Sequence, residues 1–286
     1  MSDHTPHNLG CSLPPGTGVC VINLDFRQDR WDDISGKILP HFDGIPVHRI
    51  SATLGVELLG FGKPPYFHGK KRDRTWAARG GCTLSHRNAL MYARAQGWSH
   101  LLILEDDIAL HSVPDADFLA ALRDTFRNMP FDVCYLGYTD PVSPVRHLAD
   151  LGSGHGFHQV FGCSTTHAYL LTASAIAWIL DKLPEPSEIW KWLTRHRAID
   201  RFYYRNLSPT LVVTAVSPAL IQQTEGFSDI MGARVSACAE NHPTEVIKSH
   251  PDPDTFALEM VKKAAEFRRA GCFDFFRGLW KSLKGF

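Results

Sequence analysis

Three consecutive acidic residues give the clearest sign of chemistry in the sequence. Glu105, Asp106 and Asp107 follow directly on an uninterrupted apolar run, 101–104. Such a run predicts a strand covered on both faces, and open α/β sheets bind ligands at the C-terminal ends of their strands. Continued strand geometry puts Glu105 and Asp107 on one side of the chain and Asp106 on the other. We predict that Glu105 and Asp107 hold Mn²⁺ or Mg²⁺; a solvated acidic turn is the alternative.

A second polar group ends the first predicted strand. Asn23, Arg27 and Arg30 come within eight residues of one another. An arginine presents a planar fork to phosphate oxygens, and an asparagine can hydrogen-bond a base or a ribose. Alternatively, the two arginines form an exposed helix face and pair with Asp29 or Asp33.

Ser85 and His86 follow a double glycine, Gly80-Gly81, which predicts a break before a helix. With Thr83 or Ser85 as its cap, the helix would present free amides that favour an anion. His86 would then orient a ligand hydroxyl or a phosphate. A buried histidine bonded to a carbonyl is the alternative.

Asp200 is the candidate general base. It stands between Arg197 and Arg201, in a segment that predicts a helix. A carboxylate near an acceptor hydroxyl could take its proton, whereas a salt bridge to the flanking arginines is the structural alternative.

The elements that must position these residues alternate between strand and helix. Such a βαβ rhythm predicts an α/β fold with a mainly parallel sheet. Two segments are predicted as loops, a long one over 53–79 and a glycine-rich one over 152–162. The strands are predicted at 19–24, 47–52, 101–104, 133–136, 168–171 and 211–216, and the helices after 25–30 and at 84–95, 116–127, 173–182 and 188–205.

Composition excludes several classes of protein. Of 286 residues, 44 % are hydrophobic and 21 % charged, which rules out a mainly disordered chain. Thirty basic residues balance thirty acidic ones, so we expect no nucleic-acid partner. The seven cysteines are scattered without a CxxC pair, which argues for a reducing compartment rather than for a disulfide framework.

The two ends of the chain differ from the middle. Residues 1–17 are polar and rich in glycine and proline, so we predict a loose leader before a single domain over 18–258. Residues 259–286 form a tail with seven basic and three acidic residues, a local charge of +4. On a helix this tail is amphipathic and suits a membrane interface; packing on the domain is the alternative. Its predicted apolar face consists of Phe276, Leu279, Trp280 and Leu283.

The order and spacing of these motifs resemble glycosyltransferase family 25, which includes lipopolysaccharide sugar transferases and collagen galactosyltransferases. The resemblance spans about residues 19–230, and its most specific pieces are GCTLSH and LEDD. The matching segments are 21–24 with Arg27 and 29–30, then 49–52, 81–86, 102–107, 168–171, 199–200 and 218–223.

The resemblance implies a GT-A-like fold, a UDP-sugar donor, a divalent metal and inversion at the anomeric carbon. It implies that Asp200 is the base and that Asp107 and Glu105 bind the metal. The residues expected at the donor are Asn23, Leu24, Arg27, Arg30, Ser85, His86, Glu105 and Asp106.

We therefore expect a metal-dependent hexosyltransferase, with galactose as the first expectation for the sugar. The expected acceptor is a hydroxyl of a cell-surface or lipid-linked glycan such as lipooligosaccharide. The expected location is cytoplasmic, in peripheral contact with the anionic inner face of the membrane. The alternatives are a metal-dependent nucleotidyl- or phosphotransferase and a non-catalytic nucleotide-sugar-binding relative.

Overall fold

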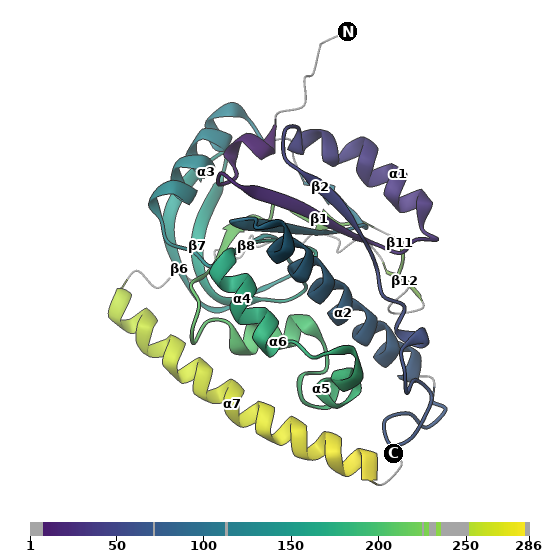
Figure 1. The fold of residues 1–286 in the computed structure, drawn as a ribbon. Coiled ribbons are helices and arrows are strands. Elements are labelled where there is room, and N and C mark those ends of the chain that lie inside the picture. The colour runs from purple at the N-terminus through teal and green to yellow at the C-terminus, as the bar shows by residue number, and fades with distance from the viewer. Residues whose placement is uncertain are drawn as a thin grey trace.

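An eight-stranded mixed sheet forms the centre of the molecule (Figure 1). The computed structural model describes residues 8–70, 72–111, 114–224, 226–228, 233–235 and 252–283. The strand order is β2-β1-β3-β8-β5-β9-β7-β6, and β7 and β8 run against the direction of the other six. The predicted mixed, mainly parallel sheet is therefore confirmed. Its strands are β1 (Thr17–Asn23), β2 (Val47–Ser51), β3 (His100–Glu105), β5 (Val133–Gly137), β6 (Pro141–Gly152), β7 (His155–Cys163), β8 (Ala168–Thr172) and β9 (Val213–Ser217).

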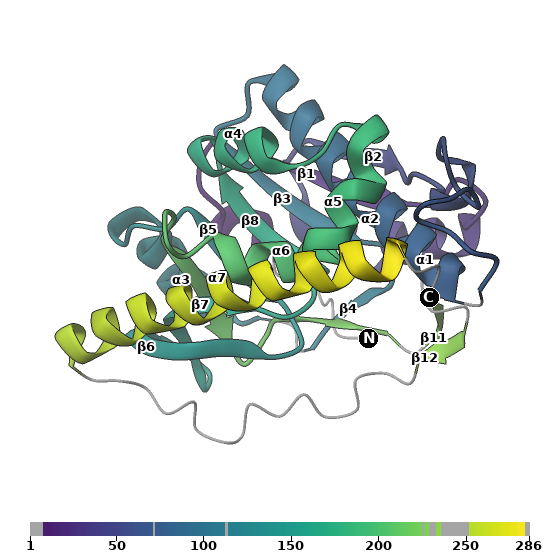
Figure 2. The same cartoon turned by 90° about the horizontal axis from the view of Figure 1, so that it is seen from below.

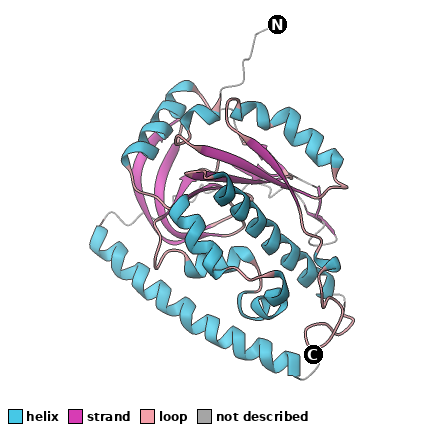
Figure 3. Cartoon of the chain, in the orientation of Figure 1, coloured by secondary structure: helices cyan, strands magenta, loops and turns pink. Residues whose placement is uncertain are grey.

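Helices cover both faces of this sheet (Figure 3). α1 (Gln28–Lys37) and α3 (Ala116–Asn128) pack on one face. On the other face lie α2 (Arg72–Gln96), α4 (Ala173–Lys182) and α6 (Ile199–Asn206). Side chains 101 and 103 of β3 enter one core and side chains 102 and 104 enter the other. This explains why the run 101–104 is apolar without interruption.

The double glycine lies inside α2 rather than before it, so the predicted helix break is wrong. A Cβ on Gly81 would come within 2.2 Å of the carbonyl oxygen of Thr53. A Cβ on Gly80 would lie 2.9 Å from the ring of Trp190, on α5 (Ile189–His196). The glycines therefore let α2 pass close to its neighbours. The helix begins at Arg72 and takes in the end of the segment 53–79, which was predicted as a loop.

Two other predicted elements differ from the structure. The predicted glycine-rich loop over 152–162 is a hairpin of β6 and β7, which turns at Ser153 and Gly154 with φ of 51° and 77°. The predicted helix over 188–205 is two helices, α5 and α6, separated at Arg197 with φ of 66°. In both places a left-handed residue ends one element.

The leader predicted as loose is packed where the structure describes it. A 3₁₀ turn, η1 (Leu9–Ser12), buries Leu9 completely, and Leu13 is 6 % exposed. Both side chains join the core that α1 and α3 cover. Residues 1–7 lie outside the described part of the chain.

Two short sheets lie beside the main one. β4 (Ile108–Leu110) pairs antiparallel with β10 (Ile221–Gln223). β11 (Gly226–Ser228) pairs antiparallel with β12 (Ala233–Val235). The first of these pairings matters for function, because it brings residue 223 next to the three carboxylates.

The C-terminal helix α7 (Pro253–Leu283) lies along the outside of the domain, across α5, α6 and β6 (Figure 2). Phe256 and Ala264 are buried, and the ring of Phe267 lies 5.4 Å from that of Phe161. Phe276 is 63 % exposed. The side chains of Leu279, Trp280 and Leu283 lie outside the described residues. Within the described ranges, no helix combines the length and hydropathy needed to cross a bilayer.

Candidate active site

A pocket of about 610 Å³ opens at the C-terminal ends of β1 and β3. Its walls come from the loops that follow these strands, from the segment after β2 and from one side of α2. This is the edge at which α/β sheets bind ligands. The predicted site residues that line it are Leu24, Arg30, Ser85, His86, Glu105, Asp106 and Asp107.

All three consecutive carboxylates face this pocket. β3 ends at Glu105 and the chain bends at Asp106 and Asp107, so strand alternation does not continue. The prediction that Asp106 points to the opposite side is therefore wrong.

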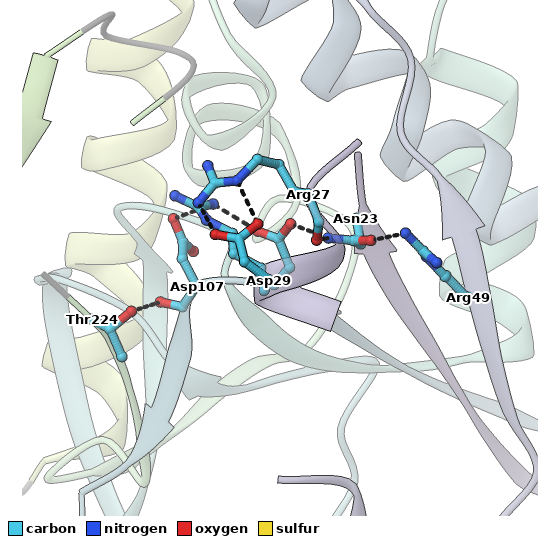
Figure 4. Close-up of polar contacts among 8 residues, drawn as sticks. Asn23, Arg27, Asp29, Arg49, Asp107 and Thr224 are labelled. Atoms are coloured by element: carbon cyan, nitrogen blue, oxygen red, sulfur yellow. Dashed lines mark hydrogen bonds and ion pairs between the residues drawn. The ribbon is translucent and has the colours of Figure 1, made fainter. Parts of the chain in front are cut away.

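Asn23 positions Asp106 from the neighbouring strand. Because Ile22 of β1 lies opposite Glu105 of β3, the next residues along the two strands also meet. The Asn23 amide donates to Asp106 Oδ2 at 2.5 Å. Arg49 of β2 donates to the carbonyl oxygen of the same amide (Figure 4). Asn23 is 1 % exposed and lies behind the pocket lining, where it fixes a carboxylate.

The two predicted arginines have separate roles. Arg30 lines the pocket, and its Nη1 donates to Asp106 Oδ1 at 2.8 Å and to Asp107 Oδ2 at 3.4 Å. Arg27 is not part of the lining. It forms two hydrogen bonds with Asp29, at 2.9 and 2.8 Å, and these bonds lower the pKa of Asp29 to about 2 (Figure 4). The predicted alternative is thus right about the pairing of Arg27 with Asp29, but Arg27 precedes α1 and is mostly buried, so it does not form an exposed helix face.

Asp107 carries unfavourable negative charge. Burial and the charge of Glu105 raise its pKa to about 7, although Arg30 acts in the opposite direction. Its main-chain oxygen accepts from Thr224 N–H at 2.7 Å. It also accepts from Thr224 Oγ1 at 3.2 Å, the contact drawn in Figure 4. Its side-chain Oδ1 is buried and has no hydrogen-bond partner among the described residues. A hard divalent cation would satisfy this oxygen and offset the charge, so these carboxylates fit Mn²⁺ or Mg²⁺.

Glu105 stays ionised although it lies deep in the site. Burial alone would raise its pKa, but hydrogen bonds and charges from His86, His167 and Thr166 outweigh burial and lower the pKa. Its Oε1 lies 3.3 Å from His86 Nε2 and accepts from Thr166 Oγ1 at 3.4 Å. Glu105 therefore brings a full negative charge to the pocket.

Ser85 and His86 lie in the middle of α2, so the anion site predicted at a helix start does not exist there. Ser85 Oγ donates to the carbonyl of Gly81 at 2.8 Å and accepts from Thr53 N–H at 2.8 Å. His86 is 1 % exposed, and its Nδ1 lies 2.8 Å from the hydroxyl of Tyr169. Both side chains line the pocket and are held by hydrogen bonds within the protein. His86 is buried, as the alternative predicts, but its ring contacts a hydroxyl and a carboxylate rather than a carbonyl.

Asp200 lies in the first turn of α6 and is not part of the pocket lining. Its Oδ1 accepts from Arg201 N–H at 2.7 Å. Its charge helps burial to raise the pKa of Cys82, which does line the pocket. Because α6 packs against α2, Asp200 is on the α2 side of the site, and its role as a base stays a prediction.

The sequence interpretation missed several pocket residues. Cys82 is one turn before His86 on α2, a spacing that puts both on one helix face. Arg74 lies in the segment 53–79, which the sequence predicts as a loop. Gln223 reaches the site only through the pairing of β10 with β4. Phe26, 61 % exposed, and Val56, 49 % exposed, form apolar parts of the wall.

Some solved structures are remotely similar to this chain. No family model matches the chain, and no curated protein matches it. The solved structure of A197 from STIV has a TM-score of 0.37 and 13 % identity, covering 74 % of this chain and 86 % of that one. A mannose-1-phosphate geranyltransferase from Thermus thermophilus has a TM-score of 0.30 and 11 % identity, with 70 % and 73 % covered. At these values neither protein bears on the activity of this chain.

Proposed function

We propose that this chain is a metal-dependent inverting glycosyltransferase of the family 25 type. It would move a hexose, galactose in the first instance, from a UDP-sugar to a glycan hydroxyl. The observation that carries the proposal is the convergence of Glu105, Asp106, Asp107 and Arg30 on one pocket at the C-terminal edge of the sheet. A nucleoside diphosphate leaving group needs both a cation and an arginine to balance its charge.

In this proposal Asp107 and Glu105 hold Mn²⁺ or Mg²⁺, which when bound neutralises charge on the departing diphosphate. Arg30 now pairs with two carboxylates. When a cation takes over that role, Arg30 can donate to phosphate oxygens instead. Asn23 keeps Asp106 in place. Leu24, Ser85 and His86 shape the wall against which the donor lies.

Inversion requires a base on the acceptor side. The acceptor oxygen forms a bond to the anomeric carbon while the bond from that carbon to the phosphate oxygen breaks. The acceptor proton passes to a carboxylate, and we assign this role to Asp200. Its place beside α2 supports the assignment, since α2 forms one wall of the pocket.

The proposed acceptor is a cell-surface glycan on a lipid, and the proposed place of action is the cytoplasmic face of the membrane. Two features support this. The pocket wall includes the exposed apolar side chains of Phe26 and Val56. The far part of α7 is basic and exposes Phe276.

A panel of UDP- and GDP-sugars tests the proposal. We expect release of UDP from UDP-galactose only with Mn²⁺ or Mg²⁺, with the sugar recovered on an acceptor or on water. Transfer of a phosphate or nucleotidyl group would show a phosphotransferase or nucleotidyltransferase instead. Tight UDP binding without turnover on any member of the panel would show a non-catalytic relative.

A further inference from the structure

Cys82, His86 and Glu105 form a compact donor cluster in the pocket wall. The thiol sulfur, a ring nitrogen and a carboxylate oxygen all lie within 4.8 Å of one another. All three residues line the pocket. The cluster is chemically unlike the pair Glu105 and Asp107, because it contributes sulfur and nitrogen as well as oxygen.

We infer that these three side chains form a site for Zn²⁺, separate from the proposed Mn²⁺ or Mg²⁺ site and sharing only Glu105 with it. Thiolate and imidazole ligands favour zinc over the harder magnesium and manganese ions. A tetrahedral zinc ion needs its donors about 3.5 Å apart. Donors that already lie within 4.8 Å reach that spacing through small side-chain rotations.

The surroundings of His86 support this site. Nδ1 lies 2.8 Å from the hydroxyl of Tyr169, which lies 3.2 Å from that of Tyr203. This chain of contacts fixes the ring and leaves Nε2 facing Glu105, 3.3 Å away. A second ring nitrogen held by an outer hydrogen bond is typical of histidines that ligate zinc.

Three protein ligands leave a fourth position that faces the pocket, where water or a phosphate oxygen can bind. Binding forms three metal–ligand bonds in place of bonds from the hydrated ion to water, breaks the S–H bond of Cys82 and releases that proton and the displaced waters to solvent. The step involves no oxidation or reduction. Because Glu105 belongs to both sites, zinc in this one removes a ligand from the other and should inhibit the proposed transferase.

Cobalt serves as a spectroscopic substitute for zinc. We expect chelator-treated protein with Co²⁺ to show a near-ultraviolet thiolate-to-cobalt band, and Cys82→Ser to abolish it. Cys82→Ser should also weaken Zn²⁺ binding at least tenfold in competition with a chromophoric chelator. Cys11→Ser and Cys272→Ser are the controls, because both cysteines are exposed. Persistence of the band in Cys82→Ser would overturn the inference.

Two measurements keep this test separate from the proposed function. Asp107→Asn should keep the cobalt band, because Asp107 is not in the cluster, whereas a loss would contradict a separate site. In the unmodified protein, Zn²⁺ should protect Cys82, but not Cys11 or Cys272, from alkylation mapped by mass spectrometry. Equal labelling of Cys82 with and without Zn²⁺ would show that its thiol does not bind zinc and would overturn the inference. Neither measurement depends on turnover.

Discussion

The Asn23 side chain holds the Asp106 carboxylate across the boundary between β1 and β3, with Nδ2 2.5 Å from Oδ2. The same amide accepts from Arg49, so one buried side chain joins three adjacent strands at the edge of the pocket. Asn23→Ala would leave Asp106 and Arg49 without this partner. We expect a loss of about 1–3 kcal/mol in the free energy of unfolding and at least tenfold weaker UDP binding.

Urea denaturation and UDP titration measure these two effects. Gln28→Ala is the matched control, since Gln28 meets Arg49 only at 3.4 Å and at the surface. If Asn23→Ala bound UDP as the unmodified protein does, the position of Asp106 would not matter for the donor.

Substitution of Asp107 should raise the free energy of unfolding and lower the activity. Burial and Glu105 raise its folded pKa to about 7 from an ordinary value of 3.8. The folded state therefore favours the protonated form. Ionised Asp107 therefore lowers the free energy of unfolding. This loss is absent below the unfolded pKa, grows as pH rises, and is complete above the folded pKa. Asp107→Asn should be more stable than the unmodified protein at pH 8, by about 1–3 kcal/mol, and the gain should shrink toward pH 4.

The same substitution should cut turnover at least a hundredfold, about 3 kcal/mol of transition-state stabilisation. Urea denaturation at pH 4.5 and pH 8, without added metal, measures the stability effect. Donor turnover with and without EDTA measures the activity effect. Full activity of Asp107→Asn, or of the unmodified protein in EDTA, would contradict the proposed metal site.

The strands that carry the site could be predicted because their sequence signal is local. The run 101–104 is apolar without interruption, and the acidic residues follow at the strand end. The structure confirms both features, because β3 contributes side chains to two cores and ends at Glu105.

The helix that forms the other wall could not be predicted in the same way. A double glycine is typical of a helix break, but it also permits close approach between a helix and its neighbours. Deciding between the two requires knowing that the carbonyl of Thr53 lies where a Cβ of Gly81 would be. That contact joins residues 28 apart in the chain. Because the helix is predicted to begin after Gly81, the prediction places Ser85 and His86 at its start and gives Cys82 no role.

Asp200→Asn separates a base from a donor ligand. Asparagine keeps an oxygen that can accept from Arg201 N–H, as Asp200 Oδ1 does at 2.7 Å, so the fold should be retained. We expect transfer to the acceptor to fall at least a hundredfold while UDP affinity changes less than twofold, because a base acts in the transition state. Isothermal titration and a transfer assay measure the two quantities.

Asp181→Asn, at an exposed helix position, is the control for this experiment. Loss of UDP binding in Asp200→Asn would make Asp200 a donor ligand or a structural residue. Unchanged transfer would assign the proton to another group.

The outer face of α7 leads to the last prediction. Leu258, Val261 and Phe276 are 54, 63 and 63 % exposed, and helical spacing puts them on one stripe. Phe256, Ala264 and Phe267 pack on the domain from the opposite side of the helix. Each lysine or arginine near an anionic leaflet contributes about 1 kcal/mol to the free energy of membrane binding.

Deleting 272–286 should therefore leave a folded protein that no longer co-sediments with phosphatidylglycerol liposomes at low salt. The contacts of Phe256, Ala264 and Phe267 lie before the deletion, which is why folding should survive. Phe276→Ser should weaken binding several-fold. Val47→Ser, at a side chain of β2 that is 37 % exposed, should leave binding unchanged. If the truncated chain unfolds, or the full chain does not bind these liposomes, the role of α7 is only to stabilise the domain.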